Sequence, residues 1–299
     1  MASKRYKKGL IIVNAYVVLP PLAAFAKRMT EEMKTLGIEM DTRSAAEIFT
    51  YIDRSGEIVI KEPFPYDFVL YLDKDRYIAS LLQKKCICIF NSAHSIEDCD
   101  DKMLTYLSLA ERGIKMPKTV PGPLNYSGSP DGEFLNNLVK ILSFPIVVKQ
   151  NFGSMGRGVF LAKNMEELKE IEAKISSEPR LYQEYIDSSY GRDHRLIVID
   201  KKVICGYERN SEGRDFRSNL GVGGTGKPIE LTKEEIEMAE EAARAFRLDY
   251  CGVDLLIGPD EKPILCEVNS NAFFEGAEKV TGVNVARAYA LHIYEWIYG

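Results

Sequence analysis

Residues 149–158 read KQNFGSMGRG, so a lysine stands directly before a glycine-rich segment. The apolar runs IVV (146–148) and VFL (159–161) flank this segment, and short runs of this kind are typical of buried strands. We therefore expect a loop that joins two strands. Glycines let backbone N–H groups approach phosphate oxygens closely, and the ammonium group of Lys149 adds a positive charge. The segment predicts a phosphate-binding flap, with an ordinary glycine-rich turn as the alternative.

Two common phosphate-binding loops do not fit this order of residues. In a P-loop the glycines precede the lysine and a helix follows, whereas here Lys149 comes first and a strand follows. In a protein kinase the lysine lies on the strand after the glycine loop, and the sequence lacks the H-R-D and D-F-G motifs of that class. The lysine at the end of the first strand therefore distinguishes this segment from both.

A second informative segment, CGVDLLIGPDEKPILCEVNSN (251–271), has an apolar run on each side of a turn. This pattern predicts a β-hairpin. A turn that is symmetric about the centre of GPDEKP pairs Ile257 with Ile264. The same register places Asp254 opposite Glu267.

This hairpin brings three oxygen-bearing side chains together. Side chains two positions apart in a strand share a face, so Asn269 is expected beside Glu267, with Asp254 across from them. Two carboxylates that face each other repel, and a divalent cation removes that conflict. Hard oxygen ligands suit Mg²⁺ or Mn²⁺, so the segment predicts a metal site. The alternative is that one carboxylate faces solvent or pairs with an arginine.

The segment DHRLIVIDKKVICGYERN (193–210) predicts another hairpin with charged residues near its open end. Asp193 and Arg195 fall on one face of the first strand, and Arg209 returns close to its start. The glycine-rich segment that follows contains Arg214, Arg217 and Asn219. Arginines at strand ends and in loops of an acidic protein indicate an anionic ligand, with solvated surface arginines as the alternative.

Composition excludes several classes of protein. The chain has 299 residues and a net charge of −5, whereas nucleic-acid-binding proteins usually carry a basic excess. Its 6 cysteines form no C-x-x-C pair and its 3 histidines are scattered. We therefore expect reduced, buried thiols and a cytoplasmic protein rather than a zinc site or a disulfide framework. No apolar run reaches the length of a transmembrane helix, so no membrane partner is expected.

Strand-like and helix-like patterns alternate through the first part of the chain, which predicts an α/β domain with parallel strands. We expect strands at 10–13, 58–60, 68–72 and 86–90, and helices at 21–36 and 78–83. Gly37 is expected to end the first helix. Near the C-terminus an apolar helical stripe predicts core packing, with a homo-oligomer interface as the alternative: Tyr289, Ile293, Trp296 and Ile297.

Taken in order, these segments resemble the ATP-grasp superfamily, and within it the RimK-type carboxylate–amine ligases. The resemblance covers about residues 95–285 and rests on Asp101-Lys102 and on FPIVVKQNFGSMGRGVFLA, LYQEYID, DHRLIVI, FRSNLGVGG, CGVDLLI and LCEVNSN. It implies an α/β (α+β) chain with the ATP-grasp fold. The implied domains are a pre-ATP-grasp α/β domain (1–95), a central subdomain with the flap (96–184) and a C-terminal subdomain with the magnesium site (185–299).

The resemblance also implies roles for individual residues. The ATP phosphates would lie near Lys102 and Lys149, under the flap residues Gly153, Ser154, Met155, Gly156 and Gly158. The adenine would contact Gln183, Glu184, Tyr185 and Ile186, with Asp193 and Asn219 also on the nucleotide side. Arg195 and Arg209 would face the transferred phosphoryl and the acyl group. Magnesium or manganese would bind Asp254, Glu267 and Asn269.

The implied activity is ATP-dependent ligation of a carboxylate and an amine through an acyl phosphate, with an amino acid or peptide as one partner. Alternatives are an enzyme that modifies ribosomal peptides, an enzyme similar to D-alanine ligases, or a regulatory ATP-binding module without catalysis. The chain departs from many relatives at His194 and at NAFFEG (271–276), and SNLGVGG lacks a basic residue before its paired glycines. The last two departures fall where substrate would bind, so they leave the acid and the amine open.

Overall fold

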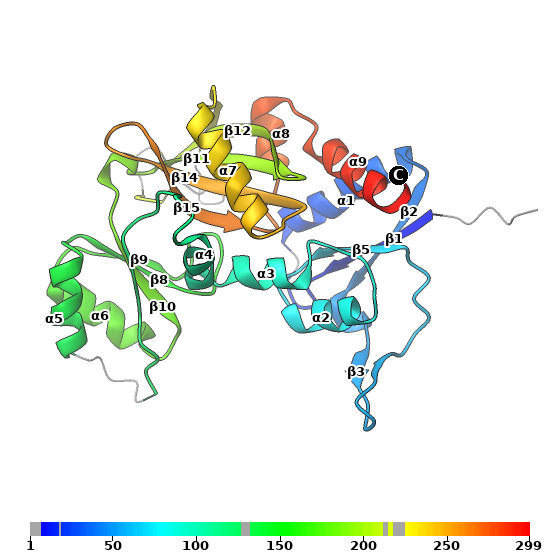
Figure 1. Cartoon of the computed structure of the whole chain (residues 1–299), viewed down its shortest axis with the longest axis horizontal. Helices are drawn as coiled ribbons and strands as arrows, with labels where there is room; N and C mark the ends of the chain where they lie inside the picture. Colours follow the sequence, from blue (N-terminus) through cyan, green and yellow to red (C-terminus); the bar gives the residue numbers. More distant parts are fainter. Residues whose placement is uncertain (1–6, 18, 127–131, 212–214, 218–224) are drawn as a thin grey trace, which may run out of the picture.

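Three β-sheets organise the computed structural model, which describes residues 7–17, 19–126, 132–211, 215–217 and 225–299 (Figure 1). The first sheet is parallel and the other two are antiparallel. Helices pack on each of them, so the predicted mixed α/β class is confirmed.

The N-terminal sheet has four parallel strands in the order β2-β1-β5-β6. Its strands are β1 (Lys7–Val13), β2 (Ile38–Ser44), β5 (Phe68–Leu72) and β6 (Ile89–Phe90). The helices between them are α1 (Pro20–Thr35) and α2 (Arg76–Lys84). A separate two-stranded hairpin, β3 (Thr50–Ile52) with β4 (Ile58–Ile60), projects from this domain.

Local sequence explains where these elements end. Helix α1 begins at a pair of prolines, which suit the first helical turn, and Gly37 takes a left-handed φ of 74° just after it. The strand expected at 86–90 is shorter than predicted. Cys86 has a φ of 58°, which ends α2 and is incompatible with an extended strand, so only the last two residues pair.

The second sheet, with strand order β7-β10-β8-β9, carries the glycine-rich flap. Its strands are β7 (Thr119–Pro121), β8 (Ile146–Gln150), β9 (Val159–Ala162) and β10 (Arg180–Glu184). Helices α5 (Gly132–Ile141) and α6 (Met165–Ile175) pack on it through a cluster that includes Leu138, Val148 and Leu168. We call this unit the flap lobe.

The third sheet has five strands in the order β13-β12-β11-β14-β15. They are β11 (Arg192–Ile199), β12 (Lys202–Asn210), β13 (Thr225–Pro228), β14 (Tyr250–Ile257) and β15 (Pro263–Asn269). Helix α7 (Lys233–Ala245) covers one face, and α8 (Glu275–Thr281) and α9 (Val285–Tyr298) follow the last strand.

Two short helices run between the N-terminal domain and the flap lobe (Figure 1). These are α3 (Ala93–Asp100) and α4 (Lys102–Leu109). The carboxylate of Asp101 accepts hydrogen bonds from Met103 N and Leu104 N, so it caps α4. That cap fixes Lys102 at the first position of the helix.

The largest core cluster joins the two ends of the chain. Phe25 and Met29 of α1 pack in it together with Tyr250 of β14 and with Tyr289 and Ile293 of α9. The apolar stripe expected near the C-terminus is therefore core at these last two positions, whereas Trp296 remains 62% exposed. The three sheets fall inside the three predicted domain ranges, and the division at residues 95 and 184 stays a prediction.

Candidate active site

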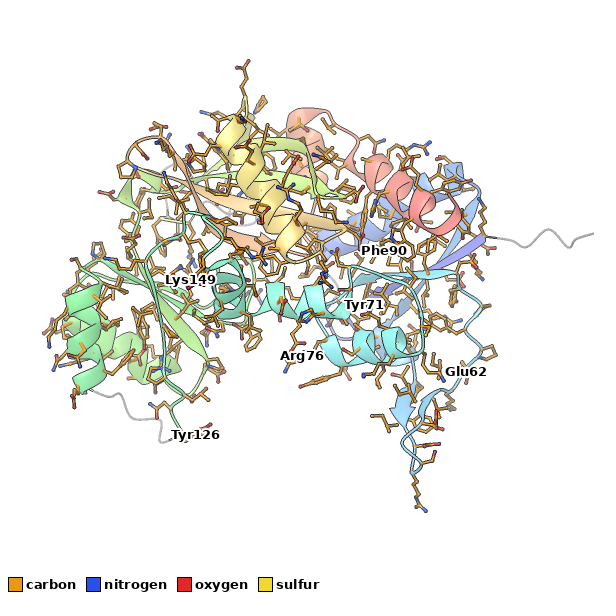
Figure 2. The ribbon with its side chains drawn as sticks, viewed as in Figure 1. Glu62, Tyr71, Arg76, Phe90, Tyr126 and Lys149 are labelled. Carbon is orange, nitrogen blue, oxygen red and sulfur yellow. The ribbon has the colours of Figure 1, made fainter. Side chains whose placement is uncertain are left out.

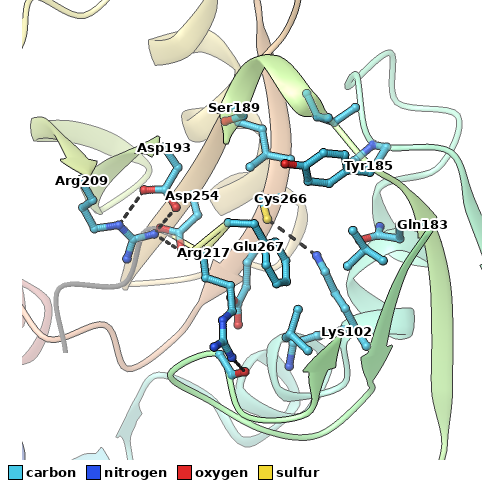
Figure 3. Close-up of a pocket in the computed structure, with 18 of the residues that line it drawn as sticks. Lys102, Gln183, Tyr185, Ser189, Asp193, Arg209, Arg217, Asp254, Cys266 and Glu267 are labelled. Atoms are coloured by element: carbon cyan, nitrogen blue, oxygen red, sulfur yellow. Dashed lines mark hydrogen bonds and ion pairs between the residues drawn. The ribbon is translucent and has the colours of Figure 1, made fainter. Parts of the chain in front are cut away.

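A cleft lies between the flap lobe and the five-stranded sheet (Figure 3). Figure 2 labels Lys149 beside α4. Residues distant in sequence meet in the cleft. It is lined by Lys102, Lys149, Gly153, Ser154, Met155, Gly156, Arg157, Gln183, Glu184, Tyr185, Ile186, Arg192, Asp193, Arg209, Phe216, Arg217, Asp254, Cys266 and Glu267, among others.

The flap is a connection between antiparallel strands, as the sequence predicts. Lys149 of β8 pairs with Val159 of β9, and Gly158 O accepts a hydrogen bond from Gln150 N at 2.8 Å. Gly158 has a φ of 73°, and a side chain there would collide with that of Gln150. Only glycine fits this position without strain, so the loop returns tightly at its end.

Neighbouring elements hold the flap over the cleft. Lys102 donates from its backbone N to Asn151 O at 3.1 Å, and its Nζ donates to Gly153 O at 3.0 Å. From the opposite side, Arg217 Nη1 donates to Gly156 O at 2.7 Å. The flap therefore contacts both α4 and the segment after β12.

Lys102 and Lys149 are buried cations that form no salt bridge with a carboxylate among the described residues, although the charge of Glu267 acts on both. Burial lowers the pKa of Lys102. For Lys149 burial acts in the same direction, but neighbouring polar groups, Cys266 first among them, outweigh it and raise the pKa. Lys149 Nζ lies 3.8 Å from Cys266 Sγ. Because an unpaired buried charge is costly, these two ammonium groups fit an anionic ligand in the cleft.

The β14–β15 hairpin confirms one predicted pairing and corrects another. Asp254 lies opposite Glu267, as expected, but Ile257 pairs with Pro263 and not with Ile264. The turn is one residue tighter than the symmetric turn assumed from the sequence, and Gly258 N donates to Lys262 O at 2.8 Å. A β-bulge at Cys266 restores the register, so Cys266 and its neighbour Glu267 both line the cleft.

Two arginines bracket the carboxylate of Asp254, which is 4% exposed. Arg195 donates to it through Nε and through Nη2, the latter at 2.6 Å, and Arg209 Nη2 lies 2.9 Å away. Arg209 also donates to both oxygens of Asp193, at 2.7 and 2.5 Å. Burial acts to raise the pKa of Asp254, but the two guanidinium groups outweigh it and hold the pKa below its usual range.

Glu267 differs from Asp254 because it makes no hydrogen bond or salt bridge with the described residues. Within those residues, no three His, Cys, Asp or Glu side chains gather as a metal cluster. Glu267 nevertheless offers free carboxylate oxygens opposite Asp254, whose oxygens keep lone pairs beyond the arginine contacts. This donor set fits one Mg²⁺ that also takes ligands from a phosphate, since Mg²⁺ is commonly held by one or two carboxylates plus substrate phosphates.

The far end of the cleft is formed where β10 ends. Gln183 is buried, and its side chain is already engaged because Nε2 donates to Thr119 Oγ1 at 2.8 Å. Glu184 Oε1 accepts from Lys118 N at 2.8 Å. Tyr185 follows the last paired residue and faces Phe216, with ring centroids 6.4 Å apart. The aromatic rings here can accommodate a flat heterocycle.

The structure brings most of the predicted residues together, but two of them are not among the residues that line the cleft. Arg195 lies directly across the sheet from Asp254 and donates to its carboxylate, and Asn269 pairs with Gly252. Asn219 and Arg214 lie outside the described residues. The site roles of these residues remain predictions.

Several lining residues were missed by the sequence reasoning: Arg157, Arg192, Phe216 and Cys266. Arg157 stands inside the quoted flap and Arg192 directly precedes Asp193, so position in a motif was an available signal. Cys266 gave no such signal because only the bulge turns it toward the cleft. Of the thiols expected to be buried, Cys86 is exposed and Cys88 and Cys266 are intermediate, and all six cysteines are free.

Comparison with protein families identifies the class. The model of the RimK-like ATP-grasp domain matches residues 99–293. The chain belongs to this family. The predicted family, the ATP-grasp fold and the predicted class of enzyme, an ATP-grasp ligase that joins a carboxylate to an amine, are thereby confirmed.

Named relatives support the same class. The chain is 37% identical over 202 residues to a probable alpha-L-glutamate ligase of Vibrio atlanticus, covering 67% of this chain and 64% of that protein. It is 30% identical over 230 residues to human beta-citrylglutamate synthase B, covering 77% of this chain and 58% of that protein. The chain thus spans under two thirds of the length of both relatives.

A solved structure shows the same fold. The D-alanine–D-alanine ligase of Bacillus anthracis, complexed with ATP, aligns with a TM-score of 0.70 at 16% identity over 97% of this chain and 99% of the other. Among the described residues, no helix is long and apolar enough to cross a membrane.

Proposed function

We propose that this ATP-grasp ligase joins the amino group of an amino acid, with glutamate as the first candidate, to a small carboxylic acid. Two relatives whose names specify glutamate or a citrylglutamate product support this choice. The observation that carries the proposal is the cleft itself. It sets two buried ammonium groups, neither of which forms a salt bridge with a described residue, against the Asp254–Glu267 pair under a glycine flap.

ATP would bind with its phosphates between Lys102, Lys149 and the flap glycines. Glycine N–H groups and the two ammonium groups are suited to phosphate oxygens. The adenine would lie at the end of β10, near Tyr185 and Ile186, where main-chain groups follow the last paired residue. Because Gln183 and Glu184 already use side-chain atoms internally, their contribution would come chiefly from the backbone.

Asp254 and Glu267 would hold Mg²⁺ or Mn²⁺, which neutralises charge on the phosphates when bound. In the reaction, a carboxylate oxygen of the acid attacks the γ-phosphorus of ATP, the bond to the β-phosphate oxygen breaks, and ADP leaves. The amine then attacks the acyl carbon, phosphate departs with the electron pair of the carbon–oxygen bond, and the nitrogen loses a proton. Arg209 lies on the cleft wall, where it can stabilise the oxyanion that develops at the acyl oxygen.

Protection of the acyl phosphate from water would fall to the flap and to the segment around Arg217. The two are joined by the hydrogen bond from Arg217 to Gly156 O. Closure of such segments excludes water and completes a site.

The test is ADP formation by the purified protein with a panel of small acids, each with and without glutamate, followed by product masses. We expect ADP release that requires both substrates and a product whose mass is their sum minus water. If ATP bound tightly but no acid and amine pair gave turnover, the chain would act as a regulatory ATP-binding module. If a different amine gave turnover, the ligase class would stand and the choice of glutamate would fail.

A further inference from the structure

Asn91 connects the N-terminal sheet to the carboxylate hairpin. It follows strand β6 directly, is 1% exposed, and uses its whole side-chain amide. Its Nδ2 donates to Tyr250 O at 2.7 Å and to Ser270 O at 2.8 Å. Its Oδ1 accepts from Asp249 N at 2.7 Å and from Tyr250 N at 3.1 Å.

Through these four hydrogen bonds, the side-chain amide of Asn91 pairs with the backbone as a neighbouring β-strand would. A carboxamide has two donors and two lone pairs, the same kinds of group as a peptide unit, and here each of them is used. The amide bonds both the N–H and the C=O of Tyr250, as a paired residue in a β-ladder would. A buried and fully satisfied polar group of this kind specifies one geometry, since any shift would leave polar atoms unpaired.

The residues held by Asn91 are the open end of the hairpin that carries the two carboxylates. Tyr250 is the first residue of β14, and Ser270 follows the last residue of β15. Asp254 lies four residues after Tyr250, and Glu267 lies three residues before Ser270. At a rise of about 3.3 Å per residue, the clamp lies roughly 10–13 Å along the strands from the carboxylates.

A second bond ties the same end of the hairpin to the N-terminal domain. Asn271 Nδ2 donates to Asp73 O at 3.0 Å. Asp73 follows β5 and Asn91 follows β6, and these strands are parallel neighbours. The carboxyl edge of a parallel sheet is where α/β folds usually meet ligands. In this chain, that edge meets the end of the hairpin instead.

We propose that Asn91 is a positioning residue that sets the relative placement of Asp254 and Glu267 by clamping β14 to the chain that leaves β15. The proposal rests on the proposed function because it takes these carboxylates as the metal ligands. The N-terminal domain would then control the geometry of the metal site, although the proposed metal ligands all lie outside that domain. Residues that orient metal ligands typically change metal affinity or activity by about 10- to 100-fold when substituted.

The test compares three variants in the full-length protein: Asn91→Asp, Asn91→Ser and, as the matched control, Ser95→Ala. Asn91→Asp keeps the shape but removes both donors and places a negative charge against two carbonyl oxygens. Asn91→Ser shortens the side chain and removes the amide group. Ser95 is also buried in the same segment and donates to a backbone carbonyl across the domains, at Phe246 O (2.7 Å), which precedes the hairpin in the chain.

Two readouts besides activity separate positioning from general stability. The first is Mn²⁺ binding in the presence of ADP, followed by the electron paramagnetic resonance signal of free Mn²⁺. We expect Asn91→Ser to weaken Mn²⁺ binding about tenfold or more and Ser95→Ala to leave it within about twofold. The second readout compares the KM for ATP with kcat. We expect kcat to fall in Asn91→Ser while KM changes little, because Lys102 and Lys149 belong to α4 and β8 and not to the hairpin.

The outcomes distinguish the two proposals. If Glu267→Gln bound Mn²⁺ normally, the metal assignment itself would fail. If Glu267→Gln lost Mn²⁺ but Asn91→Ser matched Ser95→Ala, only the role of Asn91 would be overturned. If neither Asn91 variant folded, amide exchange in the unmodified protein would decide. The Asp249 and Tyr250 amides should then be among the slowest to exchange, and rapid exchange there would contradict the clamp.

Discussion

The two sides of the cleft differ in how their charges are satisfied. One side, called the hairpin side here, is the five-stranded sheet with the β14–β15 hairpin. On this side Asp193 and Asp254 already form ion pairs with Arg195 and Arg209. On the flap side, Lys149 Nζ contacts the thiol of Cys266, and the Nζ of Lys102 donates to backbone carbonyls, so neither lysine forms a salt bridge with a described residue. On the hairpin side every charge named here except that of Glu267 is therefore in an ion pair without a ligand. On the flap side the two lysines are not.

This difference suggests a division of work between the two sides. A preorganised network holds its geometry during the reaction and so can stabilise charge that develops on the acyl group. Unpaired ammonium groups gain most from an incoming anion and therefore supply binding energy. We expect substitutions on the flap side to affect mainly the affinity for ATP, and substitutions on the hairpin side to affect mainly turnover or stability.

The largest effect is expected at Glu267, which forms no salt bridge with the part of the chain that the structure describes. Glu267→Gln should lower kcat/KM on the order of 10³-fold, since it removes a charge that acts in the water-excluded site. Its free energy of unfolding should fall by less than that of Asp254→Asn, because Glu267 acts on the buried Lys102 and Lys149 through its charge but makes no hydrogen bond or salt bridge with the described residues. ADP release and urea unfolding measure the two quantities.

Asp254→Asn is the comparison variant for Glu267→Gln. It should lose activity as well, but it should also destabilise the fold by about 3–5 kcal/mol, because Arg195 loses its buried counter-charge and Arg209 keeps only Asp193. Equal stability losses in the two variants would contradict the contrast drawn between these carboxylates.

On the flap side, Lys149→Met should raise the KM for ATP about 10- to 100-fold with a smaller change in kcat. The range follows from about 1.5–3 kcal/mol for a hydrogen bond to a charged group. Lys163→Met is the control, since Lys163 is exposed at the end of β9. A fall in kcat with an unchanged KM for ATP would show that Lys149 acts in turnover and not in ATP binding.

The flap itself should be sensitive to shape. Gly158→Ala forces a side chain onto a backbone with φ of 73° and against Gln150, so about 1–2 kcal/mol of strain should appear as roughly a 5- to 30-fold loss of kcat/KM. Gly132→Ala is the control, because a Cβ there meets nothing within 4 Å. Steady-state kinetics on both variants, with ATP varied, would show whether the flap geometry matters.

The smallest effect concerns pH. Because burial lowers the pKa of Lys102, its ammonium charge is present at low pH and is lost at a lower pH than in an ordinary lysine. The KM for ATP should therefore rise by a few-fold as the pH is raised through the alkaline range. Lys102→Arg should flatten this rise, since a guanidinium keeps its charge. An identical pH profile for both proteins would exclude Lys102 as the source.

The sequence predicted the facing carboxylates for a reason that was only partly correct. Side-chain alternation and a short turn placed Asp254 opposite Glu267. The turn is tighter by one residue, and the bulge at Cys266 adds one residue back, so the two deviations cancel at the carboxylates. Bulges depend on packing against neighbouring strands, which alternation along a single strand does not encode.

The arginine network was beyond sequence reasoning for a similar reason. That Arg195 and Arg209 lie near Asp193 followed from the predicted hairpin. Their shared contact with Asp254 depends on β14 lying beside β11, a pairing between segments about 60 residues apart. Likewise, nothing in the residues around Asn91 indicated that its amide would contact Asp249, Tyr250 and Ser270.

The core shared by α1 and α9 has a consequence for how the protein is made. Met29 and Tyr289 are 260 positions apart, yet they occupy one apolar cluster. At a translation rate of about 5–20 residues per second, the apolar face of α1 emerges some 13–50 s before its partner helix. The nascent chain thus exposes Phe25 and Met29 to the cell during that interval. The hydrogen bond from Lys7 Nζ to Tyr294 OH at 2.8 Å shows that β1 and α9 are neighbours, and a permuted chain with α9 before β1 would remove the delay.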